Sequence, residues 1–126
     1  MSAQGLKILI VEDDEMLRRM YSFIFGRDGY AIEDAITGPQ AIEKAKATKP
    51  NAILLDIMIP DMNGIEVLKT LKEDPDTRSI PVIMLSNLTS DEYINQAKNA
   101  GAALYIIKSD HEPGQILTMV NQLLGV

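Results

Sequence analysis

Five short apolar runs recur along the chain, and they constrain its fold more than any other feature. They are Leu6 to Val11, Tyr30 to Glu33, Ala52 to Leu55, Pro81 to Leu85 and Ala103 to Ile107. Runs such as AILLD and PVIML are apolar at consecutive positions rather than at alternate ones. Strands buried on both faces of a parallel sheet have this pattern. We therefore expect five strands in one parallel sheet, with helices on both sides.

The segments between these runs carry helix signals. Positions 17, 20, 21 and 24 are apolar, a spacing typical of a helix with one buried face. Pro39 near the beginning of a second helix, Gly64 before a third and Pro113 at the beginning of a fifth mark further boundaries. The sequence Thr89-Ser90-Asp91-Glu92 predicts a capping box for the fourth helix, with Thr89 as its N-cap. Strand and helix thus alternate five times, which predicts right-handed crossovers and a doubly wound α/β fold.

Composition narrows the classes of function. The 126 residues are 46% apolar and 24% charged, which fits a single globular domain. The lack of Cys excludes disulfide frameworks, thiolate metal sites and cysteine nucleophiles, and the single His111 excludes multi-histidine sites. A net charge of −6 argues against nucleic acid and anionic membranes as partners. The N-terminus has neither a signal-peptide pattern nor a membrane-spanning run, so we expect a cytoplasmic protein.

Polar residues follow the predicted strands, and in a doubly wound sheet ligands bind beyond those strand ends. They are Glu12, Asp13 and Asp14 after the first strand, Asp56 after the third, Ser86 and Asn87 after the fourth, and Lys108 and Ser109 after the fifth. Helix capping alone would explain carboxylates at the beginning of the first helix. It does not explain Asp56, because an unpaired carboxylate at the end of an apolar strand carries a desolvation cost.

Carboxylates gathered at one sheet edge repel one another unless a cation neutralises them. Oxygen ligands without His or Cys suit Mg²⁺ or Mn²⁺ better than Zn²⁺. Lys108 is the second candidate cation, although most lysines are simply solvated on a protein surface. A carboxylate, a divalent cation, a lysine and a hydroxyl together form a phosphoryl-transfer set, with Asp56 as the candidate nucleophile. A backbone carbonyl in the segment Met58-Ile59-Pro60, just after Asp56, is a further candidate metal ligand.

Four motifs, taken in order, resemble the receiver domain of two-component response regulators. They are ILIVEDD (8–14), LLDIMIPDMNG (54–64), IMLSN (83–87) and YIIK (105–108), and the resemblance covers essentially the whole chain. It implies a flavodoxin-like (βα)5 fold with strand order 2-1-3-4-5 and a single receiver domain over residues 1–126. It also implies a phosphoprotein of a phosphorelay that catalyses only its own phosphorylation and dephosphorylation, rather than an enzyme with a separate substrate.

The resemblance further implies a role for each residue of the site. Asp56 takes a phosphoryl group from a sensor histidine kinase or a histidine phosphotransfer protein. Glu12, Asp13, Asp56 and the Met58 carbonyl bind Mg²⁺, Ser86 and Lys108 bind phosphoryl oxygens, Asn87 adds a hydrogen bond or narrows access, and Tyr105 turns inward when Ser86 moves. The readout is a downstream effector protein that docks on the fourth helix, the fifth strand and the fifth helix.

Some residues around the site depart from the family pattern, and others occupy positions that affect the hydrolysis of the acyl phosphate in the family. Ser109 stands where the family usually has a proline joined to the site lysine by a cis peptide, so cis and trans bonds are both open alternatives here. Asn87 is larger and more polar than the small residue that is common after the hydroxyl. Met58 and Leu88 lie where the family tunes hydrolysis of the acyl phosphate.

Three other interpretations are open. The chain is either a stand-alone module or a receiver cut from a longer regulator. A phosphatase of the haloacid dehalogenase type also uses an aspartyl phosphate, but it has a second Asp two residues after the nucleophile, where this chain has Met58. A pseudo-receiver that only binds proteins is expected to lose Asp56, an acid of the pair or Lys108, and all of these are present.

Overall fold

The computed structural model describes residues 3–126 and contains one five-stranded parallel sheet in the order β2-β1-β3-β4-β5. The strands are β1 (Lys7–Val11), β2 (Ala31–Ala35), β3 (Ala52–Leu55), β4 (Val82–Ser86) and β5 (Leu104–Ile107). This confirms the predicted α/β doubly wound, flavodoxin-like fold and its strand order. The largest difference is in β2, which extends beyond the predicted Glu33 as far as Ala35.

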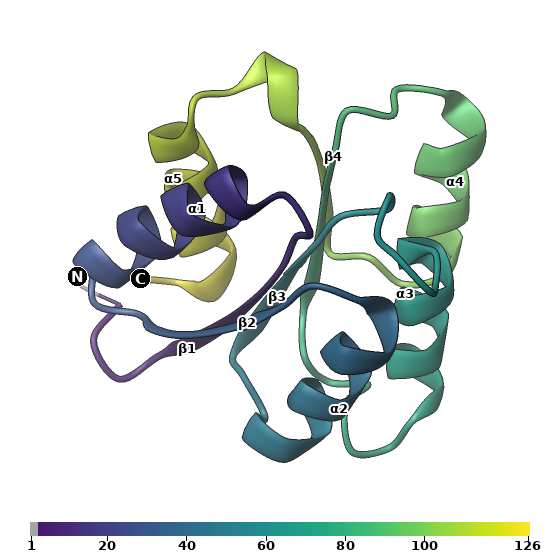
Figure 1. Cartoon of the computed structure of the whole chain (residues 1–126), viewed down its shortest axis with the longest axis horizontal. Coiled ribbons are helices and arrows are strands. Elements are labelled where there is room, and N and C mark those ends of the chain that lie inside the picture. The colour runs from purple at the N-terminus through teal and green to yellow at the C-terminus, as the bar shows by residue number, and fades with distance from the viewer. Residues whose placement is uncertain (1–2) are drawn as a thin grey trace.

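Five α-helices cover the two faces of the sheet. They are α1 (Glu15–Arg27), α2 (Gly38–Thr48), α3 (Gly64–Glu73), α4 (Asp91–Asn99) and α5 (Pro113–Leu124), and a short 3-10 helix, η1 (Lys108–Asp110), follows β5. Figure 1 shows α1 and α5 on one face of the sheet, with α2, α3 and α4 on the other. Within residues 3–126, every helix is too short or too polar to cross a membrane.

Two apolar cores, one on each face of the sheet, explain why the central strands are apolar at consecutive positions. In β1, Leu9 and Val11 pack into the core beneath α2, α3 and α4, whereas Ile8 and Ile10 pack into the core beneath α1 and α5. All four side chains are at most 1% exposed. Because both faces of β1 are buried, polar residues are accommodated only after the end of the strand.

Caps fix where two of the helices begin. The Asp14 carboxylate accepts a hydrogen bond from the Leu17 amide at 2.9 Å, so Asp14 is the N-cap of α1. The predicted capping box of α4 is wrong by one residue, because Ser90 and not Thr89 is the N-cap, its hydroxyl accepting from the Tyr93 amide at 3.4 Å. Both residue types cap well. The two residues are adjacent, and the helix begins after the second of them.

Gly64 brings the beginning of α3 against the segment that carries Asp56. Its amide donates to the Ile57 carbonyl at 2.8 Å. A Cβ at this position would lie 2.2 Å from the Asp56 carbonyl oxygen and 2.6 Å from the Ile57 Cα. Since these neighbours are backbone atoms, they cannot turn away as a side chain would. Gly64 therefore sets the close approach of α3 to the end of β3.

We predict that Gly64→Ala lowers the free energy of unfolding by about 1–3 kcal/mol, because the new methyl group overpacks against backbone. Urea denaturation followed by circular dichroism measures this. Gly114→Ala is the matched control, since a Cβ there meets nothing within 4 Å and Gly114 lies in the first turn of α5. The control leaves stability unchanged or raises it by less than about 1 kcal/mol. Equal losses in both variants would contradict the close-approach account.

Candidate functional site

Three carboxylates meet at the carboxyl edge of the sheet. The last residues of β1 and β3, Val11 and Leu55, are paired in register, so the next residues, Glu12 and Asp56, leave adjacent strands side by side. Glu12, Asp13 and Asp56 each offer a carboxylate oxygen, and these three atoms lie within 4.8 Å of one another. Glu12 and Asp56 are buried, whereas Asp13 is exposed. The structure thus brings together the three carboxylates that the sequence singles out.

Lys108 places its ammonium between two of these carboxylates. Its Nζ lies 2.8 Å from Asp56 Oδ2 and 2.5 Å from Glu12 Oε1, although 52 and 96 residues separate it from them in sequence. Lys108 follows β5 directly, and its side chain is only 11% exposed. The site therefore contains one buried ammonium against three carboxylates, which leaves an excess of negative charge.

Burial and pairing shift the protonation equilibria of the site. Burial raises the pKa of Glu12 above its ordinary value, although the hydrogen bond from Lys108 opposes this effect. Burial would lower the pKa of Lys108, but its hydrogen bonds to Asp56 and Glu12 outweigh burial and raise that pKa. Lys108 is thus held charged by the carboxylates that it neutralises.

The donor atoms of the cluster fit a hard divalent cation. All three groups offer carboxylate oxygens, the ligands that Mg²⁺ and Mn²⁺ prefer. Receiver domains in general bind Mg²⁺ at such an acidic pocket. Met58 donates its amide hydrogen to Asp56 Oδ1 at 3.3 Å, and its side chain is exposed. The role of the Met58 carbonyl as a ligand stays a prediction.

Ser86 ends β4, the strand between those that lead to Asp56 and Lys108. It is 1% exposed, and its Oγ accepts a hydrogen bond from the Leu88 amide at 3.2 Å. The Tyr105 hydroxyl, from β5, donates to the carbonyl of the same Leu88 at 2.7 Å. Burial raises the pKa of Tyr105. Ser86 and Tyr105 therefore hold one loop residue from two sides, while the predicted inward turn of Tyr105 stays a prediction.

The loop after β5 shows whether the Lys108–Ser109 peptide is cis or trans, which the sequence leaves open. The Lys108–Ser109 peptide is trans, since no cis peptide bond occurs in the part of the chain that the structure describes. The chain instead enters the η1 turn, in which the His111 amide donates to the Lys108 carbonyl at 3.4 Å. Asn87 does not donate here but accepts a hydrogen bond from the Ser109 amide at 2.9 Å. Its predicted contact with a phosphoryl group stays a prediction.

Arg18 belongs to the site, although none of the sequence motifs includes it. Its guanidinium Nη1 donates to the carbonyl of Glu12 at 3.1 Å and to that of Asp13 at 3.5 Å, and its Nε lies 3.4 Å from the Asp34 carboxylate on β2. Arg18 thereby holds the backbone of both acidic residues. The available signal is its place next to Leu17, on the side of α1 that turns toward the sheet, whereas the neighbouring Arg19 is exposed.

Comparisons with known proteins agree with the fold and the site. The chain matches the response regulator receiver domain over residues 8–121 and belongs to this family. Chemotaxis protein CheY of Thermotoga maritima is 32% identical over 94% of this chain and 98% of its own length. A CheY-like response regulator receiver domain protein from Methanospirillum hungatei has a solved structure with a TM-score of 0.88 and 31% identity, covering 95% of this chain and 94% of that one.

Other relatives are longer than this chain. Transcriptional regulatory protein ResD of Bacillus subtilis is 36% identical over 94% of this chain, which corresponds to 48% of ResD. Response regulator PleD of Caulobacter vibrioides is 35% identical over 81% of this chain, which corresponds to 22% of PleD. The chain thus spans about half of one relative, a fifth of another and nearly all of CheY. The receiver is the part that they share.

We predict that Lys108→Met lowers the free energy of unfolding by about 3 kcal/mol in the presence of a metal chelator, because two buried carboxylates lose their counter-charge. Urea denaturation measures the change. Arg19→Met is the control, since Arg19 forms an exposed pair with Glu15 at 2.8 Å, and we expect it to cost less than about 1 kcal/mol. If both variants lose the same stability, the Lys108 contacts do not hold the site together.

Proposed function

We propose that Asp56 is the phosphoacceptor of this receiver and takes a phosphoryl group from a phosphohistidine on a sensor histidine kinase or a phosphotransfer protein. The observation that carries the proposal is the buried Lys108 ammonium, which contacts both Asp56 and Glu12. Asp56 is the member of the acidic cluster that stands at the end of the central strand β3, between the acidic pair and Ser86. It can therefore be reached by the groups that would bind a transferred phosphoryl group.

In the transfer, an oxygen of the Asp56 carboxylate attacks phosphorus and the P–N bond of the donor breaks. The electron pair of that bond returns to the imidazole nitrogen, and the ring takes up one proton and leaves as neutral imidazole. Glu12, Asp13 and Asp56, with the Met58 carbonyl, would hold Mg²⁺, which when bound supplies positive charge against the phosphoryl oxygens. Lys108 would supply a second positive charge, because its ammonium lies 2.8 Å from Asp56 Oδ2.

The acyl phosphate would then switch the neighbouring loops. It adds nearly two negative charges and three acceptor oxygens, which attract the Ser86 hydroxyl and the Lys108 ammonium. If the Ser86 hydroxyl turns to a phosphoryl oxygen, Leu88 loses one of the two hydrogen bonds that it forms with Ser86 and Tyr105, and the hydrogen bond from Tyr105 must adjust. The loop leads directly to α4. The face formed by α4, β5 and α5 is thus the surface on which we expect an effector protein to dock.

The alternative enzymatic function is less well supported. A phosphatase of the haloacid dehalogenase type needs a general acid two residues after the nucleophile, and Met58 is exposed there and has no acidic group. We therefore infer that the chain catalyses only its own phosphorylation and dephosphorylation. The cytoplasm is the compartment that fits its proposed phosphodonors.

We predict that acetyl phosphate with Mg²⁺ adds one phosphoryl group to the wild-type protein and none to Asp56→Asn, as read by intact mass. Removal of Mg²⁺ with a chelator abolishes the gain. Asp61→Asn is the matched control, because Asp61 is an exposed carboxylate in the following loop and asparagine tolerates its φ of 69°. A phosphoryl group on Asp56→Asn, or a gain that survives chelation, would overturn the proposal.

A further inference from the structure

One hydrogen bond joins the two loops that carry the proposed phosphoryl-binding residues. The Ser109 amide donates to Asn87 Oδ1 at 2.9 Å across 22 residues of sequence, and we call this bond the clasp. Asn87 follows Ser86 directly, and Ser109 follows Lys108 directly. The clasp thus links the neighbour of the hydroxyl to the neighbour of the ammonium.

The clasp lies just beyond the end of the β4–β5 ladder. The last paired residues are Ser86 and Ile107, after which the chain turns into η1. There the Asn87 side-chain carbonyl accepts a backbone hydrogen bond in the way that a strand carbonyl would. Because a backbone N–H can only donate, the atom that faces Ser109 must be Oδ1 and not Nδ2. The orientation of the carboxamide is therefore set by chemistry.

This bond needs a residue other than proline at position 109 and a side-chain acceptor at position 87. A proline at position 109 has no N–H to donate, and a small apolar residue at position 87 has no atom to accept. The two departures from the family pattern, Asn87 and Ser109, are thus joined in a single contact.

We propose that Asn87 is a positioning residue, which through the clasp holds Lys108 in the place where its ammonium meets both Asp56 and an incoming phosphoryl group. This inference rests on the proposed function of Asp56. The Lys108 side chain has a limited length, so a displacement of its backbone changes which atoms its ammonium can reach. Ser109 is the next residue along that backbone, and the clasp ties it to the loop of Ser86.

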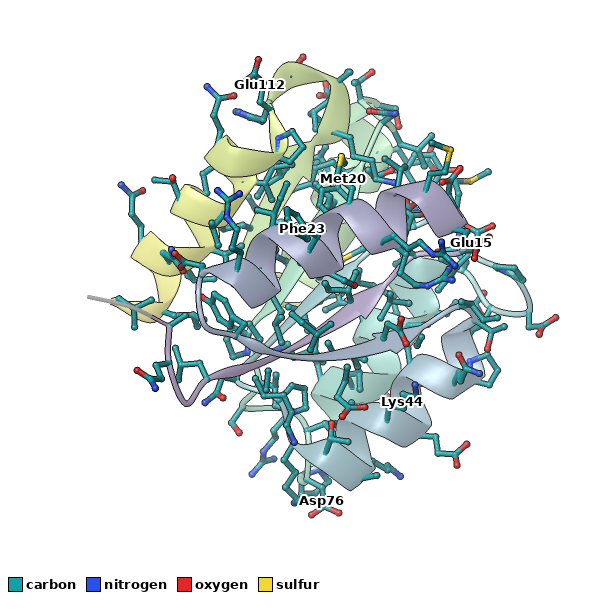
Figure 2. The ribbon with its side chains drawn as sticks, turned by 60° about the vertical axis from the view of Figure 1, so that its left-hand side comes forward. Glu15, Met20, Phe23, Lys44, Asp76 and Glu112 are labelled. Carbon is teal, nitrogen blue, oxygen red and sulfur yellow. The ribbon has the colours of Figure 1, made fainter. Side chains whose placement is uncertain are left out.

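The surroundings of the clasp separate this role from a general structural one. Asn87 and Ser109 are both exposed and lie outside the two apolar cores. They line a depression of about 290 Å³ between α1 and the loop after β5, whose walls also include Leu17, Met20 and Lys108. Figure 2 shows Met20, one of these lining residues, on α1. We therefore expect loss of the clasp to change the position of Lys108 without disturbing the packing of the two cores.

The test measures binding of beryllofluoride, a mimic of the aspartyl phosphoryl group, by NMR titration at saturating Mg²⁺. We expect Asn87→Ala to bind about threefold to tenfold more weakly than wild type, the range that loss of one hydrogen bond produces. Asn51→Ala is the matched control, because Asn51 Oδ1 accepts from the Lys7 amide at 2.8 Å in an equally exposed bond that lies outside the described site. It loses a similar bond but keeps wild-type affinity. Amide hydrogen exchange at Ser109 accelerates in Asn87→Ala and is unchanged in Asn51→Ala.

A double-mutant cycle identifies the clasp as the cause. Ser109→Pro removes the donor, so the double variant with Asn87→Ala binds no more weakly than the weaker single variant. Wild-type affinity in Asn87→Ala, or losses that add in the double variant, would overturn the clasp while leaving the phosphoacceptor role intact. Failure of the wild-type protein to bind beryllofluoride would overturn both the role and the clasp.

Discussion

The contact of the Lys108 ammonium with the carboxylates of Glu12 and Asp56 is the interaction on which the site depends. Burying a carboxylate is costly unless a counter-charge and hydrogen bonds accompany it. The parallel sheet makes this possible because the ends of β1, β3 and β5 all lie on one edge. The two apolar cores, one on each face, leave that edge as the place where charged groups gather. The Lys108 ammonium therefore makes it possible for the fold to bury the carboxylates of Glu12 and Asp56 at this edge.

Two hydrogen bonds tie the loop after β4 to β5 and to the loop that follows β5. Tyr105 reaches from β5 to the Leu88 carbonyl, and the Ser109 amide reaches back to Asn87. Ser86, the last residue of β4, accepts a hydrogen bond from the Leu88 amide. If Ser86 moves and displaces Asn87 or Leu88, the hydrogen bond from Ser109 or the one from Tyr105 is therefore strained. This coupling gives a physical route by which a negative charge added at Asp56 could change the structure of α4 and β5.

Much of the fold and of the site is predictable from local patterns. Consecutive apolar residues indicate strands covered on both faces, and the residues that follow them are placed at one edge by the topology alone, as for Glu12, Asp56 and Lys108. The N-cap of α4 is not predictable in this way, because Thr89 and Ser90 are adjacent and both residue types are good caps. Arg18 is missed because the groups of the site that it contacts, the Glu12 and Asp13 carbonyls, belong to the backbone and produce no sequence motif.

The sequence by itself determined the α/β class, the order of elements and the residue types at the carboxyl edge, because these depend on periodicity and on chain topology. Only the tertiary structure decided that Lys108 bridges Asp56 and Glu12, that the Lys108–Ser109 peptide is trans and that Asn87 accepts from Ser109. These features depend on the directions of side chains and on distances of a few ångströms between residues far apart in sequence. Such distances are set when the two cores pack, and they cannot be predicted from local sequence patterns.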